Sequence, residues 1–255
     1  MDWDAERYRD FETERNRAAA DLIARLGSQP RARIIDLGCG PGNSTELLAR
    51  RFPEADILGL DTSEDMLAAA RRRLPGRRFE RGDLADWAGG PVDLIFANAV
   101  LQWVPDHRRE MARLIGELAP EGCLAAQMPD NANEPTHRLM REVSLELPFR
   151  EKLAEARRAR EDIGAFADYA AALDPLSAKI DMWRTVYAHR LNDAASIVAM
   201  FESTGLRPYL AALDADERKL FLDVYLKRVA EAYPQLPGGG VILPFPRIFI
   251  VAFRG

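Results

Sequence analysis

A glycine-rich turn after a short apolar run constrains this chain more than any other feature. Residues 34–43 read Ile-Ile-Asp-Leu-Gly-Cys-Gly-Pro-Gly-Asn. The short run 33–37, with its apolar residues Ile34, Ile35 and Leu37, predicts a buried strand. The pattern from Ser44 to Arg51 predicts a helix directly after the turn. Glycine permits positive φ and close approach of a ligand, and the free N–H groups of the helix start point into the same space. The turn therefore predicts a ligand site at a strand-to-helix junction.

The spacing of the glycines separates two classes of ligand. A dinucleotide fingerprint has its third glycine three positions after the second. Here Gly42 comes two positions after Gly40, and Asn43 takes the diagnostic place. Asp36, just before the glycines, would repel a pyrophosphate and attract an ammonium group. These features favour a ligand with a cationic amino-acid end, such as S-adenosylmethionine (SAM), over a nicotinamide dinucleotide.

Two further predicted strands end in aspartates, Asp61 and Asp83. Ligands of doubly wound sheets bind outside the carboxyl ends of the strands, so Asp36, Asp61 and Asp83 are expected to converge on one ligand. Asp61 lies about twenty positions beyond the glycines, where a carboxylate can accept from both ribose hydroxyls. Asp83 could accept from an adenine amino group, with Leu84 supplying its N–H.

The fourth predicted strand, 92–97, ends in Asn98, and Leu101 and Trp103 follow closely. By the same topological rule, Asn98 and Trp103 face the reaction space. Tyr8, Phe11 and Arg17, around the leading helix, could fold over a ligand, and a packed aromatic on a solvated helix explains them equally well. The residues expected around the cofactor are Arg17, Asp36, Gly38, Gly40, Asn43, Asp61, Thr62, Met66, Asp83, Leu84, Asn98 and Leu101.

The alternation of strands and helices predicts an α/β fold with a doubly wound, mostly parallel, seven-stranded sheet in one domain, 1–255. Helical patterns interrupt the alternation after the fifth strand and predict a cap over 130–178. A second helical segment, 190–240, precedes the last predicted strand, 247–253. The helices expected inside the cap lie at about 136–147, 149–160 and 165–173.

Composition restricts the function further. The formal net charge of −5 disfavours nucleic acid as a partner, so a basic pocket would have to draw any anionic substrate. No apolar run reaches the ~18 residues that span a bilayer, and the polar first residues lack a signal core, so we expect a cytoplasmic protein without a membrane partner. Three histidines and two cysteines make a metal site, a disulfide framework or a histidine-based triad a poor expectation.

The motif at 36–42 resembles the glycine motif of the class I SAM-dependent methyltransferases, which have a Rossmann-like fold. In that family the glycine turn and the acid matching Asp36 hold the methionine part of SAM, and the acids matching Asp61 and Asp83 take the ribose and the adenine. Further segments look like the trans-aconitate methyltransferase family. They are 98–107, 127–131, 134–137, 183–187, 204–209 and 245–247.

This resemblance implies methylation of one carboxylate of a small tricarboxylic acid, most simply trans-aconitate, giving its monomethyl ester and S-adenosylhomocysteine (SAH). A carboxylate is already ionised at neutral pH, so the reaction requires no catalytic side chain beyond positioning residues. It needs in-line placement, a dry pocket and cations that grip the other carboxylates.

Three arginines are the expected cations. Arg247 opens the last predicted strand, which runs antiparallel in this superfamily, and Arg207 sits in a turn towards the same edge. Arg184 is less well placed, because strand alternation puts it on the face opposite Tyr187. We expect at least two of the three to reach the substrate. The residues expected around the substrate are Trp103, Asn131, His137, Arg184, Tyr187, Arg207 and Arg247.

Other functions stay open at this point. A methyltransferase of another acceptor, such as a phenol, an amine or another carboxylic acid, would share the cofactor site, and a phenol would need a base near Asn98. A dehydrogenase is disfavoured by the Gly42 and Asn43 spacing. A regulator that binds SAM without catalysis would show cofactor affinity and no methyl transfer. The sequence does not fix the oligomeric state.

Overall fold

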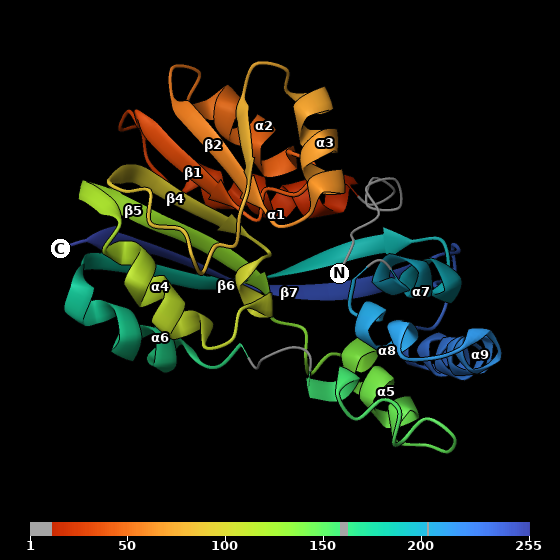
Figure 1. Cartoon of the computed structure of the whole chain (residues 1–255). Helices are drawn as coiled ribbons and strands as arrows, with labels where there is room; N and C mark the ends of the chain where they lie inside the picture. The colour runs from red at the N-terminus through yellow and green to blue at the C-terminus, as the bar shows by residue number, and fades with distance from the viewer. Residues whose placement is uncertain (1–11, 159–162, 203) are drawn as a thin grey trace. The chain divides into compact units, whose positions relative to one another are not determined.

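The computed structural model describes residues 12–158, 163–202 and 204–255 (Figure 1). Tyr8 and Phe11, expected from the sequence near a ligand, lie outside these ranges. Within the described ranges, no helix has the length and apolar character needed to cross a membrane.

The chain forms a seven-stranded sheet with the strand order β3-β2-β1-β4-β5-β7-β6. Strands β1 to β5 pair in parallel, and β7 runs antiparallel to β5. The order reverses between β1 and β4, so this sheet has the switch point of doubly wound folds. The predicted mostly parallel α/β sheet is therefore confirmed. The strands are β1 (Arg33–Leu37), β2 (Asp56–Asp61), β3 (Arg78–Arg81), β4 (Val92–Asn98), β5 (Leu118–Pro129), β6 (Ser177–Leu191) and β7 (Val241–Arg254).

Helices connect the parallel strands except β3 and β4, which a loop joins, and several helices start at side-chain caps. The hydroxyl of Ser63 accepts from the backbone N–H of Met66 at 3.4 Å. Asp214 and Glu217 form a reciprocal capping box at the start of α9, with bonds of 3.0 and 3.1 Å. The helices are α1 (Glu12–Ala24), α2 (Asn43–Arg51), α3 (Glu64–Arg73), α4 (His107–Ile115), α5 (Pro135–Ser144), α6 (Phe166–Leu173), α7 (Ala194–Glu202), α8 (Arg207–Ala211) and α9 (Ala215–Ala232).

Three predicted elements were wrong in part. In its described part, the helix expected over 149–160 is a series of turns that leads into the short 3₁₀ helix Ala156–Arg158, and the carbonyls of Ser144 and Arg150 accept from the Arg157 guanidinium. The turn expected at 204–209 becomes helix α8 from Arg207, since a proline suits the first turn of a helix. Strand β7 begins six residues before Arg247, and the Pro246 carbonyl accepts from the Asp130 N–H at 2.9 Å.

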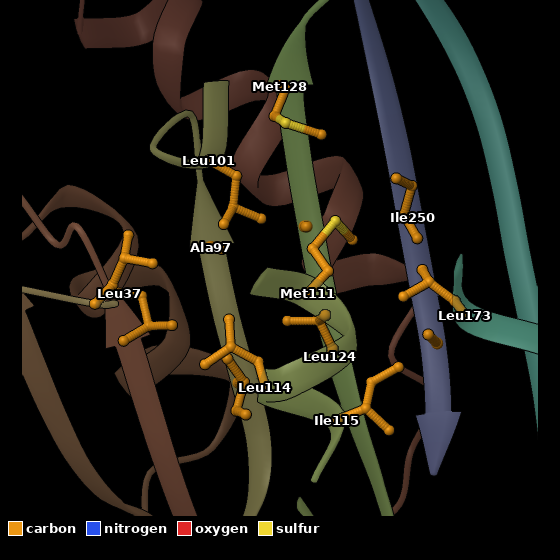
Figure 2. Packing of buried hydrophobic residues seen from close by; sticks show 14 of the residues in the cluster. Leu37, Ala97, Leu101, Met111, Leu114, Ile115, Leu124, Met128, Leu173 and Ile250 are labelled. Carbon is orange, nitrogen blue, oxygen red and sulfur yellow. The ribbon is translucent and has the colours of Figure 1, made fainter. Parts of the chain in front are cut away.

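A hydrophobic core fixes the central strands (Figure 2). Leu37 of β1, Ala97 of β4 and Leu124 of β5 are fully buried and pack with Met111 of α4 and Leu173 of α6. Helices α4 and α6 contact each other beside these strands. Each large apolar side chain contributes about 1.5–3 kcal/mol when fully buried. The core therefore holds the carboxyl ends of β1 and β4 in place next to each other.

The described chain divides into two compact units. The first contains 12–129, 163–185 and 247–255, and the second contains the described residues of 130–162 and 186–246. Helix α6 belongs to the first unit although it lies inside the cap expected over 130–178. The predicted boundaries of a single domain with a cap and a second helical segment stay predictions.

Candidate functional site

A cavity of about 270 Å³ lies in the first unit, at the carboxyl ends of β1, β2 and β4. This is the switch point at which doubly wound sheets bind ligands. Its volume is close to the lower end of the ~300–1,000 Å³ found for ligand pockets. The lining residues are Gly38, Gly40, Pro41, Leu60, Asp61, Thr62, Met66, Gly82, Asp83, Leu84, Asn98, Ala99, Val100, Trp103 and Val104.

The glycine turn shapes the floor of this cavity. Gly38, Gly40 and Gly42 all have positive φ, at 64°, 54° and 86°. A Cβ on Gly38 would lie 2.4 Å from Cγ2 of Val100, so glycine is needed there for packing as well as for conformation. A Cβ on Gly40 would meet no atom within 4 Å. The backbone at Gly40 is therefore open for the close approach of a ligand, as the sequence predicts.

Asp61 joins the end of β2 to the glycine turn. One carboxylate oxygen accepts from the Gly40 N–H and the other from the Ser63 N–H, each at 2.9 Å. Burial raises the pKa of Asp61, although these backbone bonds oppose the rise. A carboxylate can accept about four hydrogen bonds, so Asp61 keeps acceptor capacity for the hydroxyls of a ligand.

Asp83 lies in the cavity lining next to Leu84, as expected from the sequence. Its side chain is exposed, and Oδ1 accepts from the Ala85 N–H at 3.0 Å. Thr62, directly after β2, and Met66, in the first turn of α3, also line the cavity. Asp61 and Asp83 thus lie at the two successive strand ends where the sequence predicts them.

Asp36 differs from this pattern. It is fully buried, and Oδ2 accepts from the Ser44 hydroxyl at 2.8 Å and the Thr45 hydroxyl at 2.6 Å. Burial raises the pKa of Asp36 to about 7, because the charged form is desolvated. The structure places Asp36 beneath the start of α2 and outside the cavity lining, and its expected contact with a ligand stays a prediction.

Three other residues expected at the cofactor are also outside the lining. The Asn43 side-chain amide donates to Asn16 of α1 at 3.2 Å, because Asn43 starts α2 where that helix meets α1. Arg17 is exposed on α1. The Leu101 side chain is fully buried in the core, since the short 3₁₀ turn Leu101–Trp103 directs it inward while Trp103 lines the cavity.

A chain of hydrogen bonds joins Arg247, in the middle of β7, to the carboxyl ends of β5 and β4. Nη1 of Arg247 donates to Oε1 of Gln127 at 2.8 Å, and Nε2 of Gln127 donates to Oδ1 of Asn98. Gln127 is fully buried and Arg247 is 4% exposed. Arg247 is the seventh residue of β7 and not its first, but its pairing with Pro129 keeps it at the carboxyl end of β5.

Arg184 does not line the cavity. Its side chain donates to the Gly164 carbonyl at 3.0 Å, and its guanidinium lies 4.8 Å from the centre of the Phe166 ring. These contacts hold the side chain at the start of α6, and the expected place of Arg184 beside the substrate stays a prediction.

Two of the expected substrate residues join an aromatic cluster in the second unit. His137 meets Phe201 edge-on at 5.1 Å, and Phe201 stacks with Phe245 at 6.1 Å. Phe245 also contacts His189 at 5.6 Å, and His189 stacks with Tyr187 at 6.2 Å. The cluster therefore connects His137 and Tyr187, which the sequence placed in different motifs.

Asn131 and Arg207 belong to the same unit. Asn131 is 2% exposed, and Arg207 is a half-buried first residue of α8. Four residues expected around the substrate therefore belong to the second unit, and their contact with the substrate stays a prediction. These four residues are Asn131, His137, Tyr187 and Arg207.

Relatives of this chain decide its family. A family model described as a methyltransferase domain matches residues 34–122. A trans-aconitate 2-methyltransferase of Rhodopseudomonas palustris (strain BisB18) is 51% identical over 255 residues and covers 99% of each chain. One of Methylobacterium nodulans is 55% identical over 254 residues, covering 99% of this chain and 98% of the relative. The chain belongs to the trans-aconitate 2-methyltransferase family.

Solved structures agree with the fold of this trans-aconitate 2-methyltransferase family member. The YcgJ protein of Bacillus subtilis matches with a TM-score of 0.61 at 12% identity, covering 93% of this chain and 98% of that chain. At this identity the likeness concerns the fold alone. Among the described residues, no group of three or more His, Cys, Asp or Glu side chains is placed to hold a metal ion.

Sequence reasoning missed some residues of the site. It did not single out Val100 and Val104, which form apolar lining after β4, or Gln127, which links Asn98 to Arg247. A signal for Gln127 was present, because it is the one polar side chain within the apolar run 123–128. A polar residue in a strand buried on both faces needs partners, and that requirement points to a hydrogen-bonded site.

Proposed function

We propose that this protein transfers a methyl group from SAM to a carboxylate of trans-aconitate, giving a monomethyl ester and SAH. The observation that carries the choice of acceptor is the similarity, along nearly the whole of both chains, to trans-aconitate 2-methyltransferases. The position of the cavity, at the switch point of the sheet, supports the proposal that SAM binds there.

The chemistry of the cavity fits SAM. Gly40 leaves open space beside the backbone, where the amino-acid part of a ligand can approach closely. Asp61 keeps acceptor capacity for ribose hydroxyls, and Asp83 with the Leu84 N–H offers an acceptor and a donor to an adenine edge. In this proposal Asp36 acts indirectly, by ordering Ser44 and Thr45 at the start of α2.

The proposed reaction requires no acid–base catalysis by a side chain of the protein. When bound, SAM supplies a methyl group on a sulfonium sulfur, and its transfer forms a C–O bond, breaks the C–S bond and leaves the electron pair on sulfur. The acceptor carboxylate is ionised at neutral pH, so no side chain has to remove a proton. Val100, Trp103 and Val104 supply apolar lining that keeps water away from the transfer.

Arginines would hold the carboxylates that are not methylated. Arg247 lies at the carboxyl end of β5, and Arg207 starts α8 in the second unit. A charge-assisted bond from a guanidinium to a carboxylate contributes about 1.5–3 kcal/mol. Arg247 is therefore the first choice for the substrate cation and Arg207 the second, while Asn131, His137 and Tyr187 stay weaker choices.

Incubation with methyl-labelled SAM and a panel of acids tests this function. Label should enter a base-labile ester with trans-aconitate, and much less with cis-aconitate, citrate or succinate. Equal labelling of a phenol or an amine would favour another acceptor class. Binding of SAH without methyl transfer to any acid would contradict an enzyme and favour a SAM-binding regulator.

A further inference from the structure

The buried position of Gln127 would destabilise the fold if its side-chain amide had no hydrogen-bond partners. Gln127 is fully buried in β5, between Ala126 and Met128, which are also fully buried. A buried amide that lacks partners destabilises a fold by about 1–3 kcal/mol. Both ends of the Gln127 side chain have partners, which are Arg247 and Asn98.

The chemistry of these partners fixes the orientation of two amides. A guanidinium can only donate, so the Gln127 carbonyl oxygen must face Arg247. The Gln127 NH₂ group then faces Asn98, which has to present its own oxygen. The Asn98 NH₂ group is thereby left for other partners, and Asn98 lines the cavity. The positive charge of Arg247 thus determines, through Gln127, which end of the Asn98 amide a ligand can meet.

We propose that Gln127 is a positioning residue for methyl transfer. It holds the Arg247 guanidinium at the carboxyl end of β5 and turns the Asn98 amide so that its NH₂ group donates into the cavity. This inference rests on the proposed carboxyl methylation, because it gives Arg247 a substrate carboxylate to hold. A donor at Asn98 suits a ligand that carries acceptor oxygens and cannot serve as the base that a phenol would require.

A double-mutant cycle on the kinetics tests the link to Arg247. Gln127→Met keeps the size of the side chain and removes both hydrogen bonds, and it should raise KM for trans-aconitate and lower kcat/KM at least tenfold at saturating SAM. In an Arg247→Ala background the same substitution should change kcat/KM less than twofold, because Gln127 acts through Arg247. Equal factors in both backgrounds would overturn the link. Cys123→Ala, also fully buried in β5, is the matched control and should leave kcat/KM within twofold of the wild type in either background.

A second cycle on cofactor binding tests the link to Asn98 without any acceptor. Calorimetry with SAH should show a three- to tenfold weaker Kd for Gln127→Met, and no further change when Asn98→Ala is already present. A wild type that methylates no tricarboxylate would contradict the proposed function, and this second cycle would still decide the role of Gln127. If Gln127→Met changes kcat/KM but not the Kd for SAH, the link to Asn98 is overturned. If it changes the Kd for SAH but not kcat/KM, the link to Arg247 is overturned.

Gln127→Glu provides the test if the methionine variant does not fold. The Arg247 guanidinium favours the ionised form of the introduced carboxyl group, which can accept from Arg247 but has no donor for Asn98. SAH should therefore bind Gln127→Glu at least threefold more weakly than the wild type at neutral pH, and Asn98→Ala should abolish this difference. Wild-type affinity of Gln127→Glu would overturn the positioning role.

Discussion

The two compact units hold their functional residues in different ways. In the first unit the cavity depends on backbone conformation: Gly38 and Gly40 adopt positive φ, and the Asp61 carboxylate accepts from two backbone N–H groups. In the second unit the aromatic cluster of His137, Tyr187, His189, Phe201 and Phe245 depends on side chains packed on one another. Single substitutions should therefore lower ligand affinity or the free energy of unfolding more in the first unit than in the second.

The largest effect is expected from Asp61→Ala. This change removes the acceptor of the Gly40 and Ser63 N–H groups and the proposed acceptor of two ribose hydroxyls. Two charge-assisted bonds contribute about 1.5–3 kcal/mol each, so SAH affinity measured by calorimetry should fall at least about 100-fold. Asp56→Ala is the control, because Asp56 starts the same strand and forms an exposed pair with Arg78. Undiminished SAH binding by Asp61→Ala would contradict the cofactor site.

The next effect concerns Asp36 and pH. Its pKa of about 7 in the folded chain lies above the unfolded value of 3.8, so the folded chain binds more protons between these pH values. The free energy of unfolding should then fall by as much as about 4 kcal/mol as pH rises from 4 to 7. Denaturation of Asp36→Asn over this range should show a shallower fall, with the remainder coming from Asp61, whose pKa burial also raises. The same slope in both proteins would show that Asp36 ionises freely in the folded chain.

The sequence predicted the cavity well because its parts are close together in the chain. Alternating strands and helices over 33–103, with the rule on carboxyl ends, place Gly40, Asp61, Asp83 and Asn98 together without knowledge of any side-chain contact. The position of Asp36 could not be predicted in the same way. Its carboxylate could face a ligand or the neighbouring hydroxyls, and only the packed structure shows that Ser44 and Thr45 take it.

Predictions for the substrate residues were weaker for the same physical reason. Period-two alternation gave no partner for Arg184, which turns to the Gly164 carbonyl and the Phe166 ring. Because the prolines at 244 and 246 disfavour a strand, the first half of β7 was not predicted, and Arg247 was expected at the start of the strand. Its pairing with Pro129 nevertheless puts it at the expected edge. The position of such a residue depends on the register between strands that are far apart in the sequence, and the local residue pattern does not reveal that register.

A comparison of two glycines separates conformation from packing within the first unit. Gly38→Ala has to keep positive φ, at about 1–2 kcal/mol, and also place its Cβ against Val100, at about 1–3 kcal/mol. Gly40→Ala has only the conformational cost, because no atom lies near the new Cβ. Chemical denaturation should therefore show a loss of about 2–5 kcal/mol for Gly38→Ala and about 1–2 kcal/mol for Gly40→Ala. Equal losses would mean that Val100 moves aside without cost.

The smallest effect is expected in the second unit, for Tyr225→Phe. The Tyr225 hydroxyl, on α9, donates to the Thr136 carbonyl of α5 at 3.2 Å, and the residue is fully buried. Phenylalanine keeps the ring against Phe221 and removes one hydrogen bond, so the free energy of unfolding should fall by about 0.5–1.5 kcal/mol.

Tyr209→Phe is a matched control, because Tyr209 stacks on the same Phe221 ring and lies in the same unit. Its loss should be smaller, since Tyr209 lies on α8 and its hydroxyl does not join α5 to α9. A loss for Tyr225→Phe as large as that of Gly38→Ala would break the contrast between the units, because one side-chain hydrogen bond would then matter as much as a strained backbone.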